Sequence, residues 1–219
     1  MRIEKFVHSC LRITVGGESL LFDPGKFSFV DGRVDPHQLA GPSLVALTHD
    51  HPDHIDFDAL RIILGQRPPT ILANGEAAKA LREKGFSPTI FEHGQQTFGP
   101  FRLVAIPTPH APILAKETPI VTAFKVNEGL LNVGDSLDPG LHRFADTEIL
   151  AMPVMAPFLT ELDVFAFAKA MRPRTLIPLH DGYARDYFVE QRYDTYEPFL
   201  KGVGIRLLRM SDPGASVEV

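Results

Sequence analysis

The sequence has little of several features, and each shortage excludes a class of protein. Only one of its 219 residues, Cys10, is a cysteine, so no disulfide can form within the chain, and we expect a cytoplasmic location. The longest nonpolar run, 149–159, is shorter than the roughly 20 residues that span a bilayer. The 22 lysines and arginines are scattered, and the formal net charge is −5. We therefore expect no membrane partner and no nucleic-acid partner.

Hydrophobic residues are abundant and alternate with turn residues along the chain. They make up 44% of the sequence, enough for one sizeable core. We expect a single domain over residues 1–219. The predicted strands span 5–15, 18–23, 43–48, 70–73, 89–91, 101–108, 120–126, 129–135, 148–153, 175–180 and 205–210, and the predicted helices span 55–64, 76–85, 160–171 and 195–202. This order predicts a layered α/β fold of two similar halves, with both faces of the sheets covered.

Residues 48–54 read THDHPDH and hold three of the nine histidines. They directly follow a predicted strand. Side chains two positions apart in an extended segment share a face, so His49 and His51 can ligate one metal ion together. Pro52 makes the chain bend, and Asp53 and His54 then project elsewhere, where they can ligate a second ion. A histidine-rich surface loop is the alternative, but carboxylates and imidazoles packed this closely favour a cation between them.

Three further candidate ligands lie at the ends of other predicted strands: His110, Asp135 and His180. Open α/β sheets place their sites at the carboxyl ends of strands, so we expect these side chains to meet the first cluster. Taken singly, each could be a turn or helix-cap residue. Taken together, they predict a metal site of nitrogen and oxygen ligands without sulfur.

The cluster and its distant partners resemble a known family over nearly the whole chain. Residues 49–54 match the HxHxDH motif of the metallo-β-lactamase superfamily, and the three later residues match its downstream ligands in order. The resemblance implies an αββα sandwich with a binuclear site in the cleft between two sheets. It also implies a first ion held by His49, His51 and His110, a second held by Asp53, His54 and His180, and a bridging Asp135.

A narrower resemblance concerns residues 8–28, HSCLRITVGGESLLFDPGKFS, and the DHID sequence at 53–56. Both are similar to the branch that includes ascorbate-6-phosphate lactonase, the N-acylphosphatidylethanolamine phospholipases D and many uncharacterised metal-dependent hydrolases. Two departures are that Val7 stands where a glycine commonly precedes the histidine, and that the segment around His110 reads TPHAP.

The superfamily resemblance implies a hydrolase with two divalent metal ions. We expect zinc, with manganese or iron as alternatives. A metal-bound hydroxide would attack an ester, lactone or phosphodiester of a small molecule. Asp53 and Asp135 are the expected catalytic residues, Asp135 as the bridging ligand and Asp53 as a ligand that also relays a proton. Ligation alone is the alternative for Asp53.

Several other polar residues are candidates for supporting roles. His8 and Asp23 could bind the outer N–H groups of metal-bound imidazoles. The alternatives are a buried strand histidine for His8 and a turn-former for Asp23. Asp181, Tyr183 and Arg185 follow the last ligand and could line the cleft, where Arg185 could bind a substrate anion.

The remaining polar residues near the motifs have weaker signals. Asp50 alternates away from the ligand face and could be a supporting or a solvent-exposed residue. The histidines that match no motif are interpreted as surface residues: His37, His93 and His142.

Other functions remain alternatives to a hydrolase. The main one is a non-catalytic metal-binding or ligand-sensing module, although such a module would not need a bridging Asp135. A di-iron redox enzyme and an RNA nuclease rank lower, because no flavin domain and no basic arm are evident. A homo-oligomer is left open, and no motif names the substrate.

Overall fold

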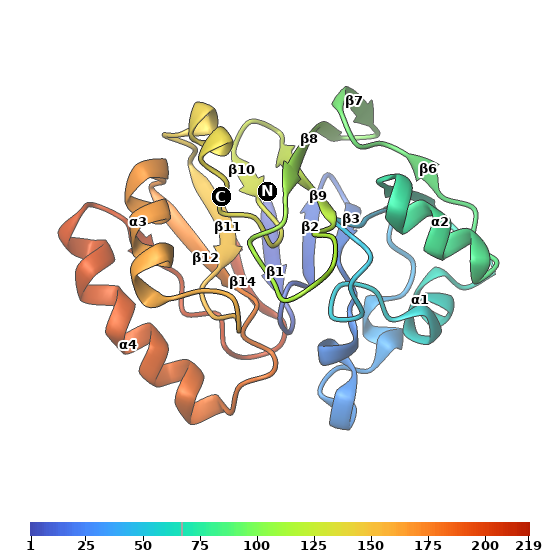
Figure 1. Cartoon of the computed structure of the whole chain (residues 1–219). Coiled ribbons are helices and arrows are strands. Elements are labelled where there is room, and N and C mark those ends of the chain that lie inside the picture. The colour runs from blue at the N-terminus through green and yellow to red at the C-terminus, as the bar shows by residue number, and fades with distance from the viewer. Residues whose placement is uncertain (67) are drawn as a thin grey trace.

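The fold, seen in a computed structural model that describes residues 1–66 and 68–219, is built on two seven-stranded sheets with helices on their outer faces (Figure 1). The first sheet has the order β14-β1-β2-β3-β4-β5-β6 and the second the order β13-β12-β11-β10-β9-β8-β7. The strands of the first sheet are β1 (Arg2–Lys5), β2 (Leu11–Val15), β3 (Glu18–Phe22), β4 (Leu44–Ala46), β5 (Thr70–Ala73), β6 (Thr89–Ile90) and β14 (Ala215–Glu218). Those of the second sheet are β7 (Gly94–Phe98), β8 (Phe101–Pro109), β9 (Ile120–Val126), β10 (Leu130–Asn132), β11 (Ile149–Pro153), β12 (Thr175–Leu179) and β13 (Arg206–Leu207).

The helices divide between the two outer faces. The α-helices are α1 (Phe57–Leu64), α2 (Gly75–Glu83), α3 (Glu161–Met171) and α4 (Asp186–Gly202), and the short 3-10 turns are η1 (Lys26–Ser28), η2 (Val30–Gly32), η3 (Pro36–Leu39) and η4 (Pro139–Phe144). Helices α1 and α2 lie beside the first sheet and α3 and α4 beside the second, at opposite sides of the molecule (Figure 1). None of the described helices is long and apolar enough to cross a bilayer.

The two sheets have the same internal pattern. In the first, β14 to β3 pair antiparallel, and β3 to β6 pair parallel. In the second, β7 to β10 pair antiparallel, and β10 to β13 pair parallel. Parallel neighbouring strands must be joined by crossover connections, which commonly contain a helix. These helices pack on the outer faces of the sheets.

Three hydrophobic clusters account for the layers. One fills the space between the sheets, with Phe22 and Phe124 from opposite sheets 5.6 Å apart at their ring centroids. A second packs α3 and α4 on the outer face of the second sheet, around the fully buried Tyr193. A third packs α1 and α2 on the first sheet. The predicted αββα layered fold is therefore confirmed.

Several predicted element bounds are wrong. The strand predicted over 5–15 is instead the last residue of β1, a tight turn in which Phe6 N donates to Cys10 O over 2.9 Å, and β2. The helix predicted at 195–202 begins much earlier, at Asp186, and contains Pro198. The strand predicted at 205–210 is only two residues long, and β7 and β14 were not predicted. The first error matters for the site, because the turn between β1 and β2 positions His8.

Candidate metal centre

All seven predicted ligands meet at one end of the two sheets. The segment 47–56 joins β4 to α1, and it bends sharply because the backbone N–H groups of His54 and Ile55 both donate to His51 O, over 2.9 and 3.0 Å. His110, Asp135 and His180 follow β8, β10 and β12. Asp56 then caps α1, since its side chain accepts from two backbone N–H groups of the first turn. The helix start therefore fixes the exit of the histidine loop.

The first group of donors consists of His49, His51, His110 and Asp135. One ligand atom from each lies within 4.8 Å of the others. His49 Nε2 is 3.0 Å from His51 Nδ1, and His110 Nε2 is 3.5 Å from an oxygen of Asp135. Three imidazole nitrogens and one carboxylate oxygen this close together are a donor set typical of zinc and related transition metals.

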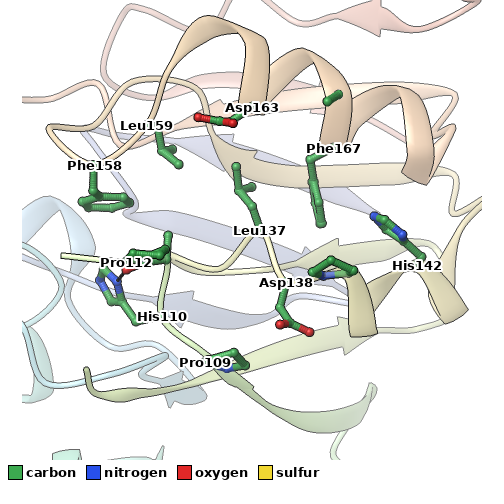
Figure 2. A pocket seen from close by; sticks show the side chains of 13 residues that line it. Pro109, His110, Pro112, Leu137, Asp138, His142, Phe158, Leu159, Asp163 and Phe167 are labelled. Atoms are coloured by element: carbon green, nitrogen blue, oxygen red, sulfur yellow. Dashed lines mark hydrogen bonds between the residues drawn. The ribbon is translucent and has the colours of Figure 1, made fainter. Parts of the chain in front are cut away.

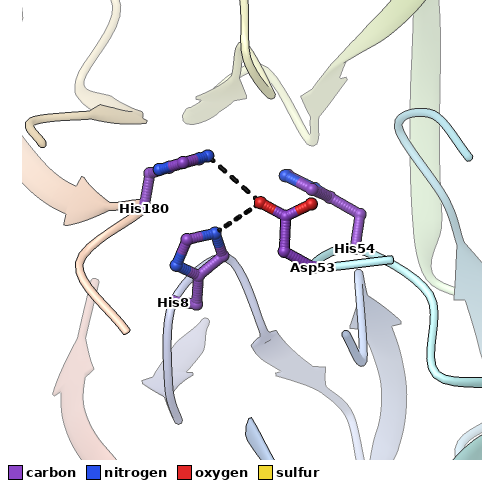
Figure 3. A group of neighbouring side chains, drawn as sticks. All are labelled: His8, Asp53, His54 and His180. Carbon is purple, nitrogen blue, oxygen red and sulfur yellow. Dashed lines mark hydrogen bonds and ion pairs between the residues drawn. The ribbon is translucent and has the colours of Figure 1, made fainter. Parts of the chain in front are cut away.

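The second group contains Asp53, His54 and His180 together with His8 (Figure 3). Asp53 Oδ2 lies 3.3 Å from His180 Nε2 and 3.1 Å from His8 Nε2. These side chains come from three separate segments, namely the turn after β1, the bend before α1 and the end of β12. The predicted second-ion residues are therefore close neighbours, and His8, predicted as a supporting residue, lies among them.

Asp135 lies between the two groups. One oxygen, Oδ1, is 3.2 Å from His54 Nε2, and the other, Oδ2, is 3.1 Å from His180 Nε2 and 3.8 Å from His49 Nε2. The carboxylate thus contacts imidazoles of both groups. This position agrees with the predicted bridging role, which stays a prediction.

The outer nitrogens of the imidazoles have fixed partners. His180 Nδ1 donates to Met155 O over 2.9 Å, and His110 Nδ1 donates to Ala111 O over 2.6 Å. His54 Nδ1 lies 3.0 Å from Asp23 Oδ2. A donor bond at Nδ1 leaves Nε2 unprotonated in a neutral imidazole, which is the form that ligates a metal ion. This contact agrees with the expectation that Asp23 binds the outer N–H group of a metal-bound imidazole.

Asp23 also holds the histidine loop itself. Its two oxygens accept from the backbone N–H and the hydroxyl of Thr48, both over 2.8 Å. The next residues pack directly on the motif: a Cβ added to Gly25 would lie 1.7 Å from the carbonyl oxygen of Asp53. The DPG segment after β3 therefore shapes the ligand loop through backbone contact.

His8 supports Asp53 from the turn between β1 and β2. Its backbone has a φ of 65°, in the left-handed region, and its ring is fully buried. The N–H of Gly182 donates to His8 Nδ1 over 3.0 Å. A neutral imidazole that accepts at Nδ1 carries its proton on Nε2, so His8 Nε2 donates to Asp53 Oδ2. His8 therefore holds a metal-ligand candidate in place instead of being a ligand itself.

Four buried atoms test whether the residues fit metal ions. His54 Nε2, His110 Nε2 and both oxygens of Asp135 have no hydrogen-bond partner among the described residues. A native interior rarely leaves buried polar atoms unsatisfied, and each such group costs free energy. Here the four atoms belong to ligand candidates of the two groups. The donor set fits two divalent cations.

Nearby charges shift the pKa values of the carboxylates downward. Burial alone would raise the pKa of Asp135, but the charges of His54 and His180 hold it well below its usual range. Burial also opposes ionisation of Asp53, yet hydrogen bonds from His180 and His8 outweigh it and lower that pKa. Both carboxylates are therefore ionised at neutral pH.

The pKa values of the imidazoles shift in opposite directions, depending on the neighbouring groups. Burial lowers the pKa of His8 to about 4 and that of His49 well below its ordinary value. Burial also disfavours charge on His180 and His54, but Asp135 outweighs it, so the pKa of His180 rises to about 9 and that of His54 rises well above its ordinary value. The site therefore attracts positive charge, which is what a cation-binding centre requires.

A cleft of about 620 Å³ opens onto both groups of donors. His51, Asp53, Asp135 and His180 line its floor, and Tyr183 lies at its wall as predicted. Burial raises the pKa of Tyr183 to about 12, so its hydroxyl is neutral.

A second hollow, of about 670 Å³, adjoins the cleft. In Figure 2, His110 and Pro112 lie at one end of it, Phe167 and His142 at the other, and Phe158 above the shared side. His142, interpreted from the sequence as an ordinary surface residue, therefore lines a hollow beside the site.

Two residues predicted to line the cleft do not. Asp181 is buried behind His180, where Lys5 Nζ donates to both its oxygens over 3.0 and 2.9 Å. Arg185 is exposed at the start of α4 and is absent from the described lining of the cleft. Asp50 lies half-buried beside His51, at a separate polar hollow. The other lining residues had no readable signal, because they come from loops without a motif: Lys26, Phe27, Pro112, Ile113, Leu114, Pro157 and Phe158.

Comparisons with known proteins identify the family and agree with the fold. The model of a family described as "Beta-lactamase superfamily domain" matches residues 2–180. Protein Rv0786c of Mycobacterium tuberculosis is 30% identical over 187 residues, which cover 82% of this chain and 84% of that protein. A UPF0173 metal-dependent hydrolase of Methylobacterium nodulans is 25% identical over 95% of both chains. A crystal structure from Parabacteroides distasonis has a TM-score of 0.75 at 20% identity, covering 94% of this chain and 90% of that one.

Proposed function

The chain belongs to the metallo-β-lactamase superfamily, and on that premise we propose that it is a hydrolase that uses two divalent metal ions to cleave an ester, lactone or phosphodiester of a small molecule. One observation supports this proposal most strongly. The buried atoms of His54, His110 and Asp135 without hydrogen-bond partners belong to two adjacent donor groups, and the Asp135 carboxylate contacts imidazoles of both. A non-catalytic module would need neither the shared carboxylate nor a cleft that opens on it.

Two bound divalent ions would supply a strongly acidified water molecule at neutral pH and would polarise the substrate oxygen. The residues that would hold them are those of the two groups, with zinc as the proposed metal and manganese or iron as alternatives. His8 is the exception, since its Nε2 proton faces Asp53.

Asp53 is the carboxylate suited to proton transfer. Its side chain is 21% exposed to the cleft, whereas that of Asp135 is 2% exposed. Its Oδ2 accepts from His8 Nε2 and faces His180 Nε2 within the second group, which leaves Oδ1 as the acceptor for a proton from the nucleophile. His8, held neutral by burial, keeps the carboxylate oriented without competing for that proton.

The branch of the superfamily is also part of the proposal. The sequence resemblance to ascorbate-6-phosphate lactonase and the N-acylphosphatidylethanolamine phospholipases D rests on residues 8–28 and 53–56. In the structure His8, Asp23 and Gly25, all within the first segment, contact the second segment or the histidine loop. We keep one domain over residues 1–219, a cytoplasmic location and a small-molecule substrate as predictions of this proposal.

Metal content of protein purified without chelators or a histidine tag tests the proposal, measured by elemental mass spectrometry. We expect about two transition-metal ions per chain, and turnover of at least one ester, lactone or phosphodiester by the metal-loaded protein. His51→Ala and Asp135→Ala should each lose metal and turnover while remaining folded. His37→Ala is the matched control, since His37 is exposed and pairs with Asp35.

The outcomes separate the two functions. Folded protein that binds no metal would refute the site. Protein that holds two ions but cleaves no member of the three substrate classes would favour the ligand-sensing alternative. Unchanged turnover in Asp135→Ala would show that the bridging assignment is wrong.

A further inference from the structure

The wall of the cleft is mostly apolar. The side chains along it belong to three loops: Phe27 before the metal motif, the 112–114 segment after His110, and Pro157 and Phe158 after β11. Leu114 is fully exposed at the mouth, and Phe27 is half-buried with its ring 5.0 Å from that of His8. A large solvent-facing apolar surface beside a polar floor is typical of a binding site for an apolar ligand.

One cation interrupts this apolar wall. Among the described residues that line the cleft, only Lys26 has a permanent positive charge. Its side chain is exposed, and no ion pair with it occurs within the described residues. Its backbone is fixed, because Lys26 N donates to Pro52 O over 2.9 Å and Gly25 packs against the backbone of Asp53. The ammonium group therefore extends from a rigid anchor beside the metal motif.

The polar hollow that also borders His51 has a different lining from the cleft. It is lined by four carboxylates, Asp50, Glu76, Glu83 and Glu117, and by one lysine, Lys79. Such a surface repels an anion. The carboxylates of this hollow and the ammonium group of Lys26 thus favour the Lys26 side of the site for an anionic group of a ligand.

Resting on the proposed hydrolase function, we propose that the substrate is an anionic amphiphile. Its scissile group lies over the metal centre, its apolar chain or ring lies along Phe27, Leu114 and Phe158, and an anionic group remote from the scissile bond pairs with Lys26 Nζ. Apolar contact with the wall supplies affinity, and the lysine selects the charged end.

Binding of two matched probes to the zinc-loaded protein tests this assignment by calorimetry. The probes are 1-octanesulfonate, whose sulfonate is a poor metal ligand, and 1-octanol, which has the same chain without the charge. We expect the sulfonate to bind about two- to fivefold more tightly than the alcohol at low salt, as for a solvent-exposed ion pair. The difference should shrink at high salt. Ethanesulfonate should bind at least about tenfold more weakly than octanesulfonate, because it lacks most of the apolar chain.

Two lysine variants and one leucine variant separate the contributions. Lys26→Ala should abolish the preference for the sulfonate over the alcohol, and Lys169→Ala should keep it, because Lys169 is exposed on α3 and absent from the described lining of the cleft. Leu114→Ser should weaken both eight-carbon probes. A wild-type protein without the preference, a Lys26→Ala variant that retains it, or ethanesulfonate binding equal to that of octanesulfonate would overturn the inference.

These results are independent of turnover. If the probes bind through Lys26 but no ester, lactone or phosphodiester is cleaved, only the hydrolase function fails. If neutral esters are cleaved and the probes show no dependence on Lys26, only the substrate class fails.

Discussion

Replacing Lys5 with methionine tests a buried ion pair behind the metal centre. The Lys5 side chain is 1% exposed and that of Asp181 is 5% exposed, with 2.9 Å between Nζ and Oδ2. Lys5 Nζ also donates to Met210 O, and the hydroxyl of the fully buried Tyr193 donates to Asp181. This network joins β1 to α4 and to the residue that follows His180. Removal of the lysine leaves a buried carboxylate without its counter-charge.

The expected loss of stability in Lys5→Met follows from the burial of the ion pair. Breaking a buried pair by deleting one partner typically costs about 3–5 kcal/mol, against a total stability of about 5–15 kcal/mol. With a urea dependence of about 2 kcal/mol per molar, Lys5→Met should lower the midpoint of urea unfolding by about 1.5–2.5 M. Circular dichroism at increasing urea concentration measures this midpoint.

Two controls isolate the charge effect. Arg172→Met removes the cation of an exposed pair with Asp146, whose side chains are 61% and 67% exposed, and should leave the midpoint unchanged. Adding Asp181→Asn to Lys5→Met removes the uncompensated charge and should recover part of the loss. The reasoning is refuted if Lys5→Met shifts the midpoint no more than Arg172→Met does.

Two further predictions concern packing and reactivity. Gly25→Ala should destabilise the protein by at least about 2 kcal/mol and reduce its metal content, because the new Cβ would overlap the backbone of Asp53. Gly202→Ala, in open space at the end of α4, should be neutral or slightly stabilising; equal effects in urea unfolding would contradict the packing argument. Burial raises the pKa of Cys10 to about 12, so the folded protein should not react with a thiol reagent at pH 8 and should react once unfolded. At that pH the thiolate fraction is about a thousandfold below that of an ordinary thiol, and it should rise about tenfold with each pH unit until the pH approaches 12. Rapid labelling of the folded protein, followed by mass spectrometry, would disprove this.

The ligand positions could be predicted from the sequence because their signal is local. Each candidate lies at the end of a short apolar run, and the direction of a strand decides where the next side chains can meet. His110, Asp135 and His180 are far apart in the sequence, yet strands β8, β10 and β12 end near the same place. The layered fold is predictable for a similar reason, because the order of strands and helices along the chain indicates how they stack in layers.

The turn that positions His8 could not be predicted in this way. The segment 5–15 contains no glycine, proline or asparagine to signal a turn, and its apolar residues continue on both sides. The left-handed backbone of His8 is compensated by tertiary bonds: Gly182 N donates to its ring, and His180 N donates to its carbonyl oxygen over 3.3 Å. Partners about 170 residues away decide this conformation, so no local rule finds it.

The residues of the cleft show why closeness in sequence is a poor guide to closeness in the site. Asp181 directly follows His180, but the chain turns there with a φ of 66° at His180, and the carboxylate faces Lys5 and the interior. Lys26 precedes the motif by more than twenty residues, yet its backbone is bonded to Pro52 within it. A ligand motif specifies the metal because the ion needs particular atoms at fixed spacing. Substrate selection needs only an apolar wall and a correctly placed charge, which loops of almost any sequence can supply, so it must be derived from the folded surface.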